Sequence, residues 1–263
     1  MRTVTSPVLT LDLSGPAAIG IFVKIPALEI VDLVAAAGFD FVIMDTEHSV
    51  LSPRDVYELV VAYSSLGVPA LVRLSDHGYG DGQRYLDAGA AGLLVPHVSE
   101  AGEAREIMRC FSFPPAGTRG LGYAARVSGW GGNPGGLGEY VRRGDEDVRR
   151  IAMIEDAAGV RNLTDIVAQP GVDGVFVGAG DLALEMGEPL GSPGVRAVVD
   201  DVVRRCVAAK VPVGVMTSDV EEAAARGAQG VSFVVATSDA ALVQRASAAT
   251  VAAFRSKGLG TRP

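Results

Sequence analysis

Ionisable side chains recur in this sequence directly after short apolar runs. Asp45, Glu47 and His48 follow one run, Arg73 ends a second, and Glu155 ends a third. In a parallel β/α protein, catalytic side chains gather where buried strands end. His48, with an unperturbed pKa near ~6.5, is the natural general base, and Asp45 and Glu47 are expected to support it. Arg73 offers a bidentate fork for a carboxylate or an oxyanion, and a salt bridge at the same edge is the alternative.

Two carboxylates, Glu155 and Asp181, lie at the ends of consecutive apolar runs. If these runs are neighbouring strands, the two acids converge and repel each other unless a cation lies between them. Oxygen ligands of this kind suit Mg²⁺, Mn²⁺ or Co²⁺, with water or substrate oxygens completing the coordination. The alternative is that such acids cap the following helix, which fits Asp156 and could also fit Asp181. The pair favours a divalent metal site.

A pattern of helix, small-residue turn and apolar strand repeats along the chain, and glycine suits the left-handed end of each helix. Counting the runs predicts eight strands, near residues 18–23, 39–45, 69–73, 92–98, 151–155, 174–178, 211–216 and 230–235. Helical periodicity lies between them, for instance at 53–65, 99–111 and 195–209. Eight such units fit a (β/α)8 barrel, and we expect residues 1–263 to form one domain. A doubly wound sheet is the alternative, but no Gly-x-Gly-x-x-Gly follows the first strand.

Bulk properties exclude several kinds of partner. The net charge of −8 argues against nucleic acid, which needs a basic face, and no apolar stretch reaches the ~20 residues of a membrane helix. Residues 1–19 lack a basic region followed by an apolar core, so we expect no signal peptide and a cytoplasmic location. Cys110 and Cys206 fall in predicted helices, where we expect reduced thiols. The stretch 114–147 is predicted to be a long functional loop, a lid or a subunit contact.

The other histidines and the lysines carry weaker signals. His97 ends the fourth predicted strand and points to the same edge as His48, whereas His77 precedes a glycine-rich loop, residues 78–80, and is expected to face solvent. A Schiff-base aldolase needs a desolvated lysine inside the barrel, and Lys24 follows the first strand. No Gly-x-Ser-x-Gly occurs, so nucleophilic serine chemistry has little support.

Residues 39–48, Phe-Asp-Phe-Val-Ile-Met-Asp-Thr-Glu-His, resemble the signature of the HpcH/HpaI aldolases, the metal-dependent class II pyruvate aldolases. The resemblance covers roughly residues 18–255 and continues in the same order through 72–73, 86–90, 94–96, 114–120, 154–155 and 171–182. It implies a (β/α)8 barrel of the phosphoenolpyruvate/pyruvate type, whose last helix packs on a neighbouring subunit, commonly in a hexamer. Asp87 resembles an acidic residue that the neighbouring subunit contributes near the catalytic histidine.

The same resemblance assigns roles to the residues of the site. Glu155 and Asp181 would bind the divalent metal, and His48 would be the base, acting through water. Arg73 would hold the carbonyl oxygen of pyruvate. Backbone amides near Gly180 and Asp181 would hold its carboxylate.

Several residues around the expected pocket depart from the family pattern. Met153 stands where the family has Gln, two residues before the metal glutamate and therefore on the same face of the strand. Phe22 replaces a usual Trp, and Lys24, His97 and Gly180 stand where a small residue, Met and Ala are usual. These residues surround the expected pocket, so their departures from the family pattern bear on which substrate is bound and which reaction is catalysed.

The sequence therefore predicts a divalent-metal-dependent C–C lyase. The enzyme would cleave or form a 4-hydroxy-2-oxo acid from pyruvate, or a related 2-oxo acid, and an aldehyde through a metal-stabilised enolate. The alternatives are an enzyme that makes the enolate by decarboxylating oxaloacetate, a CoA-ester lyase of the wider superfamily, and a non-catalytic subunit that binds metal and 2-oxo acid. The adjacent Glu47 and His48 favour the aldolase branch over the CoA-ester lyases.

Overall fold

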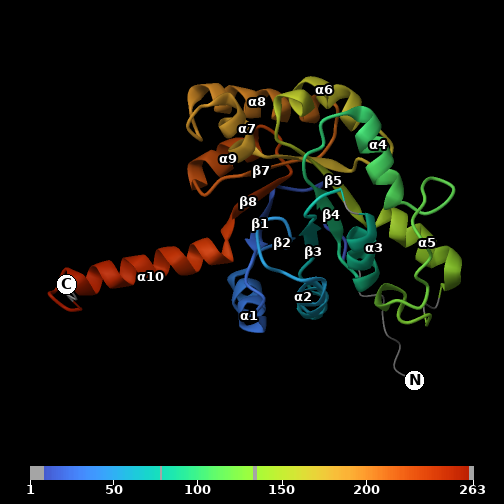
Figure 1. The fold of residues 1–263 in the computed structure, drawn as a ribbon, viewed down its shortest axis with the longest axis horizontal. Helices are drawn as coiled ribbons and strands as arrows, with labels where there is room; N and C mark the ends of the chain where they lie inside the picture. The colour runs from blue at the N-terminus through green and yellow to red at the C-terminus, as the bar shows by residue number, and fades with distance from the viewer. Residues whose placement is uncertain (1–8, 78, 133–134, 261–263) are drawn as a thin grey trace.

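The computed structural model describes residues 9–77, 79–132 and 135–260. Within them, eight parallel strands close into a barrel in chain order, β1 pairing with both β2 and β8 (Figure 1). The strands are β1 (Ala18–Val23), β2 (Phe41–Asp45), β3 (Ala70–Arg73), β4 (Gly92–Val95), β5 (Arg149–Ile154), β6 (Gly174–Val177), β7 (Val213–Met216) and β8 (Phe233–Ser238). The predicted (β/α)8 barrel is confirmed. The first eight residues of the segment examined for a signal peptide lie outside the described residues.

Helices follow the strands, and all but the last lie around the barrel (Figure 1). They are α1 (Leu28–Ala37), α2 (Pro53–Ser65), α3 (Tyr79–Ala88), α4 (Ala101–Cys110), α5 (Gly136–Glu146), α6 (Ala157–Val167), α7 (Ala179–Met186), α8 (Pro193–Ala208), α9 (Val220–Ala228) and α10 (Asp239–Arg255), with a 3₁₀ turn at Arg126–Ser128. The start of α2 shows how local sequence fixes these bounds. Ser52 and Asp55 form a reciprocal capping box there, and Pro53 follows the cap.

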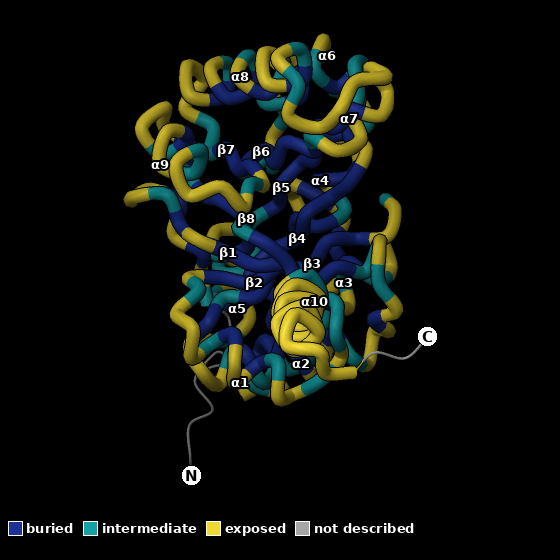
Figure 2. Tube along the Cα trace, turned by 90° about the vertical axis from the view of Figure 1, so that its left-hand side faces the viewer, coloured by how far each residue is buried: buried dark blue, intermediate teal, exposed yellow. Residues whose placement is uncertain are grey.

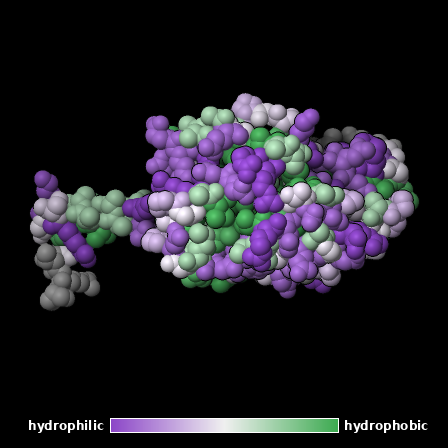
Figure 3. Space-filling model, turned by 90° about the horizontal axis from the view of Figure 1, so that it is seen from above, coloured by the Kyte–Doolittle hydropathy of each residue, from purple (hydrophilic) through white to green (hydrophobic). Residues whose placement is uncertain are grey.

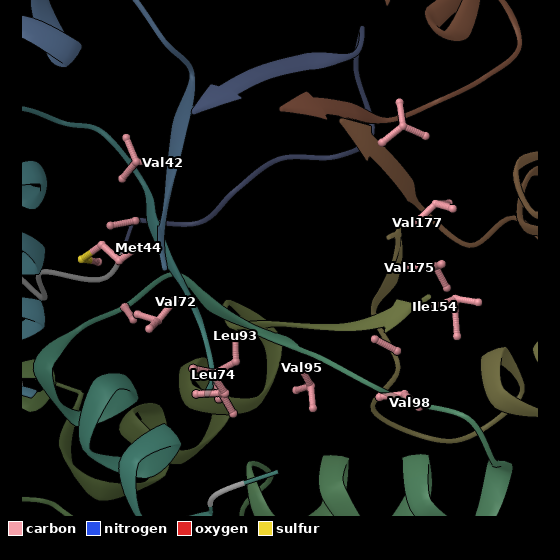
Figure 4. Close-up of a cluster of buried hydrophobic side chains, with 14 of the residues drawn as sticks. Val42, Met44, Val72, Leu74, Leu93, Val95, Val98, Ile154, Val175 and Val177 are labelled. Carbon is pink, nitrogen blue, oxygen red and sulfur yellow. The ribbon is translucent and has the colours of Figure 1, made fainter. Parts of the chain in front are cut away.

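Alternate residues of each strand face two different cores. On β2, Phe41 and Ile43 belong to the core inside the barrel, whereas Val42 and Met44 belong to the core between barrel and helices. Figure 4 shows members of this outer core pointing away from the barrel axis. Gly20 admits the Phe41 ring, because a Cβ at position 20 would lie 2.2 Å from that ring. The interior is therefore filled with side chains, and only the strand ends are open to solutes.

Several predicted strands are shorter than expected, the fourth most of all, and one predicted loop is partly helical. The strand expected at 92–98 ends at Val95, because Pro96 lacks an N–H for the ladder and His97 has a left-handed backbone, with φ 55°. Within the described part of 114–147, α5 and the 3₁₀ turn form, and Phe113, Val127 and Tyr140 pack together. Cys110 and Cys206 are free thiols in α4 and α8, as predicted.

The last helix, α10, stands away from the barrel (Figures 1 and 2). Asp239 at its start is buried and accepts hydrogen bonds from the backbone N–H groups of Lys24 and Ile25, which ties the helix to the end of β1. Apolar side chains remain exposed along the projecting part, which is partly green in Figure 3: Leu242, Val243, Val251 and Phe254. Among the described helices, none has the length and apolar character needed to cross a membrane.

Candidate active site

The carboxyl-terminal ends of the strands, called the rim below, carry a buried ionic network built around Asp45. Arg73 donates to both oxygens of Asp45, over 2.9 and 2.7 Å, and the ammonium of Lys24 lies 2.6 Å away. Asp45 also accepts the backbone N–H groups of Glu47 and His48. Burial raises the pKa of Asp45, but the bonds from Arg73 and Lys24 outweigh it and hold that pKa below its usual range. Asp45 therefore shapes the loop that carries His48.

Arg73 has a second carboxylate partner and an aromatic one. Its Nη1 lies 3.1 Å from Glu47, and its guanidinium carbon lies 4.9 Å from the centre of the Phe22 ring. Arg73 is thus fixed in orientation, with its side chain 7% exposed. Arg73 therefore forms the salt bridges that were the alternative interpretation, and it also lines the cavity described below.

Glu155 and Asp181 lie on adjacent units of the barrel, at the end of β5 and in the first turn of α7. Glu155 is buried, whereas Asp181 is exposed. Burial raises the pKa of Glu155 to about 7; the His97 N–H opposes this shift, and the negative charges of Asp181 and Glu47 add to it. Across the described ranges, no lysine or arginine pairs with either acid. The raised pKa of Glu155 shows that its negative charge is poorly compensated, with His97 as its one basic partner among the described residues.

Gly178 leaves room for the Glu155 side chain. A Cβ at position 178 would lie 2.4 Å from Cβ of Glu155 and 2.6 Å from its Oε2, so a side chain at this position would displace the glutamate. Oε2 therefore faces the start of α7, where Asp181 lies. The alternative that Asp181 caps α7 is wrong because Gly178 holds the cap position, whereas Asp156 does cap α6 by accepting the Gly159 N–H.

This donor set fits a divalent cation. Two carboxylate ligands with remaining positions for water and substrate are typical of Mg²⁺ and similar ions. In the described chain, no three His, Cys, Asp or Glu side chains form a ready-made metal centre. The protein would therefore supply two ligands and leave the other positions open.

His97 is the residue whose importance the sequence understated. Its Nδ1 lies 3.0 Å from Glu155 Oε1 and its Nε2 lies 3.1 Å from Glu47 Oε1. Its backbone N–H donates to the same Oε1 of Glu155 over 2.7 Å. The sequence offered two signals, a histidine at the end of the fourth predicted strand and its departure from the Met that is usual in the family. Which carboxylates it meets depends on the curvature of the barrel and on the left-handed turn.

The structure changes the interpretation of Lys24 and His77. Lys24 is an ammonium paired with Asp45 and donating to the carbonyl of His48 over 3.2 Å, which disfavours the free amine that a Schiff base requires. The prediction that His77 faces solvent is wrong, because its ring is half-buried, 3.0 Å from the carbonyl of Pro96 and 3.3 Å from Glu103. Gly78, the first residue of the predicted loop, lies outside the described residues, and the next two begin α3.

Asp87 lies in α3, away from the cavity of its own chain. Arg119 donates to it over 2.9 Å, and burial raises its pKa against the effect of that bond. Within the chain, the structure therefore does not bring Asp87 to His48.

A cavity of ≈ 780 Å³ opens at the rim. Its walls include most of the predicted residues, namely Phe22, Lys24, His48, Arg73, Met153, Gly180 and Asp181. Further cationic side chains, Arg196 and Arg245, lie on its α8 and α10 side. Asp181, an imidazole and several cations line this cavity, and Glu155 packs against Gly178 on its wall without lining it directly. This set suits a small anionic substrate held near a metal ion.

Comparison with known proteins shows the family of this chain. The model of the HpcH/HpaI aldolase/citrate lyase family matches residues 18–246. The chain belongs to this family. This HpcH/HpaI chain is 33% identical over 243 residues to the pyruvate aldolase of Rhizobium etli, a match that covers 92% of this chain and 94% of that protein. The predicted family, and with it the prediction of an aldolase-type enzyme, is confirmed.

Two solved structures superpose closely on the chain. The HpcH/HpaI aldolase from Desulfitobacterium hafniense DCB-2 gives a TM-score of 0.86 at 29% identity, covering 92% of this chain and 94% of that one. The citrate synthase SbnG gives a TM-score of 0.83, also at 29% identity, covering 92% of this chain and 95% of that one. Proteins with different names therefore share this barrel.

Proposed function

We propose that this protein is a divalent-metal-dependent aldolase that joins or separates pyruvate, or a close 2-oxo acid, and an aldehyde. The single observation that carries the proposal is the pair Glu155 and Asp181, two carboxylates without a lysine or arginine partner in the described chain, at the rim of the cavity that Asp181, Arg73 and His48 line. The relative from Rhizobium etli is named a pyruvate aldolase, and a relative from Deinococcus radiodurans is named a hydroxypyruvate/pyruvate aldolase.

Each residue of the site has a proposed role that follows from its position. A Mg²⁺, Mn²⁺ or Co²⁺ ion held by Glu155 and Asp181 would polarise the 2-oxo group and supply the charge stabilisation that the enolate needs. Arg73, rigidly held by two carboxylates, presents its remaining surface to the carbonyl oxygen of the substrate. The N–H groups at the start of α7, near Gly180, face the substrate carboxylate and carry the positive end of the helix dipole.

His48 is placed to move the proton of the aldehyde-side hydroxyl. Its backbone is held by Asp45 while its ring, 60% exposed, lies on the wall of the cavity. The ring lies 3.7 Å from Glu47, which leaves it free to turn toward the substrate or a water molecule. An exposed ring with a fixed backbone suits a base that meets its substrate at the cavity mouth.

The decisive experiment measures carbon–carbon bond cleavage and synthesis with pyruvate and a panel of aldehydes. Chelation should abolish turnover, and Mg²⁺, Mn²⁺ or Co²⁺ should restore it. Undiminished turnover in metal-stripped protein, together with a borohydride-trapped adduct on Lys24, would overturn the proposal in favour of Schiff-base chemistry.

A second candidate reaction is the decarboxylation of oxaloacetate, with or without coupling of the product enolate. The observation that favours it is the number of cations on the cavity wall, with Lys24 and Arg73 on one side and Arg196 and Arg245 on the other, which suits a substrate with two carboxylates. Incubation with oxaloacetate in the absence of any aldehyde distinguishes the two reactions, because only decarboxylation then releases carbon dioxide above the spontaneous rate.

We also propose that residues 1–263 act as one barrel domain whose α10 packs on a neighbouring copy, in a hexamer. The exposed apolar side chains of α10, such as Val251 and Phe254, support this arrangement. Asp87 would then reach the His48 region of a neighbouring copy. Light scattering of the wild type and of Phe254→Asp tests the proposal, because the charged side chain should lower the oligomeric state.

A further inference from the structure

His97 joins the two acidic sides of the rim. It follows β4 and lies between Glu47, which follows β2, and Glu155, which follows β5. Each ring nitrogen lies within 3.1 Å of a different carboxylate. Both ring nitrogens therefore have acidic partners from the ends of two other strands, although the side chain is 57% exposed.

The backbone at His97 is held in an uncommon conformation. Its φ of 55° lies in the left-handed region, which costs free energy for a residue with a side chain. This turn directs the backbone N–H of His97 to Oε1 of Glu155. Backbone and ring of one residue therefore hold the same carboxylate oxygen.

The other oxygen of Glu155 is left for a different partner. Oε2 faces Gly178 and the start of α7, and Asp181 lies in the first turn of that helix. Ligating carboxylates are commonly oriented by hydrogen bonds to the oxygen that does not bind the ion. In Glu155, Oε1 accepts from His97 and Oε2 remains available to an ion, which matches that arrangement.

We propose that His97 is a positioning residue for the metal site, which fixes Glu155 so that Oε2 faces Asp181 and links that carboxylate to Glu47. The inference rests on the proposed function, since it assumes that Glu155 and Asp181 bind a divalent ion. Through Glu47, which lies 3.1 Å from Arg73, the link extends to the network on the other side of the rim. His97 acts through Glu155, and it is not assigned to the substrate.

The test compares two variants that both tolerate a left-handed backbone. His97→Gly removes the ring and keeps the turn. His97→Asn also keeps the turn, and its short amide can donate to Glu155 but cannot reach Glu47. Lys210→Gly is the matched control, since Lys210 has φ 58° and is exposed between α8 and β7.

The readout is the dissociation constant for Mn²⁺, measured from the electron paramagnetic resonance signal of the free ion. His97→Gly should bind Mn²⁺ roughly 10–100-fold more weakly than the wild type, the usual cost of losing an orienting partner. His97→Asn should recover most of that loss, and Lys210→Gly should match the wild type. Circular dichroism verifies that each variant folds.

Different results would overturn different claims. Wild-type affinity in His97→Gly, or equal weakness in the folded Gly and Asn variants, would remove the positioning role and leave the proposed function standing. A strong ¹⁴N coupling to Mn²⁺ in the wild type that disappears in the glycine variant would make His97 a direct ligand instead. Absence of Mn²⁺ binding by the wild type would reject the proposed function and the inference with it.

Discussion

On the β1–β3 side of the rim, each acid has a basic partner: Lys24 and Arg73 lie 2.6 and 2.7 Å from Asp45, and Arg73 lies 3.1 Å from Glu47. On the β5–β6 side, Glu155 and Asp181 have no lysine or arginine partner among the described residues. The first side is rigid and electrostatically complete without help. The second side lacks such a partner, so we expect the metal ion to bind there. We expect the substrate to contact Arg73 on the first side.

The largest expected effect comes from removing charge on the incomplete side. Glu155→Gln preserves side-chain size but removes one of two proposed ligands, so calorimetry should detect no Mn²⁺ binding and turnover should fall by roughly 10³-fold or more, corresponding to several kcal/mol of lost Lewis-acid stabilisation. Glu221→Gln, at an exposed position on α9, is the control. Normal Mn²⁺ affinity in Glu155→Gln would mean that the ion binds elsewhere.

The next effect isolates the base on the complete side. His48→Ala should reduce turnover by roughly 10²–10⁴-fold, the range for a positioned acid or base. Mn²⁺ affinity should stay at the wild-type value, because His48 is not proposed as a ligand. If calorimetry instead shows that the ion is lost, the separation of the rim into a metal side and a base side breaks down.

A pH titration sharpens the comparison without any mutation. Burial raises the pKa of Glu155 to about 7 in the folded protein, above its ordinary value of 4.5, so the folded state holds this proton more tightly than the unfolded state. This contribution to stability is complete below pH 4.5 and is lost as the pH rises through about 7. The melting temperature of metal-free wild type should therefore fall relative to Glu155→Gln between pH 5 and 8.

Metal binding should show the opposite trend with pH. Because the ion displaces the Glu155 proton, Mn²⁺ affinity should rise by about tenfold per pH unit below pH 7 and level off above it. An affinity that is flat from pH 5.5 to 8 would show that Glu155 binds no proton in that range and that its charge is already compensated.

The smallest effect concerns the wall between the two sides. Met153→Gln should preserve the fold, because the side chains have similar length, and should change turnover by less than the two preceding substitutions. An added amide without a partner would cost about 1–3 kcal/mol, visible as a lower melting temperature unless a metal-bound water accepts it. A rise in pyruvate aldolase activity relative to oxaloacetate decarboxylation would indicate that the thioether tunes the reaction. Unchanged kinetics on both would mean that Met153 only packs.

Much of the fold followed from local patterns. Apolar runs, several of them preceded by a glycine turn, located all eight strands to within a few residues, and the helices at 53–65 and 195–209 matched α2 and α8 closely. The helix α5 escaped prediction because Gly136, Gly138 and Gly144 lower its helical propensity, and its packing onto Phe113 through Tyr140 is a tertiary effect.

The sequence located most of the ionisable residues that the structure places at the rim, but it did not predict which of them pair, and it included Asp87, which lies away from the cavity of its own chain. Ionisable residues at strand ends could be found from the sequence, since the ends of parallel strands share one edge. Which of them touch depends on loop conformation, and so Lys24 proved to be a partner of Asp45. The left-handed turn at His97 is not encoded by a glycine, and no local pattern announces it.

Gly178 gives the rim a marker that can be looked for in other chains. Any side chain there would collide with Cβ of Glu155, 2.4 Å from an added Cβ, as well as with its Oε2. A barrel of this type that carries a larger residue at the equivalent place must turn its glutamate elsewhere or give it up. The residue at the position of Gly178 therefore predicts, from sequence alone, whether a relative can direct a carboxylate toward α7.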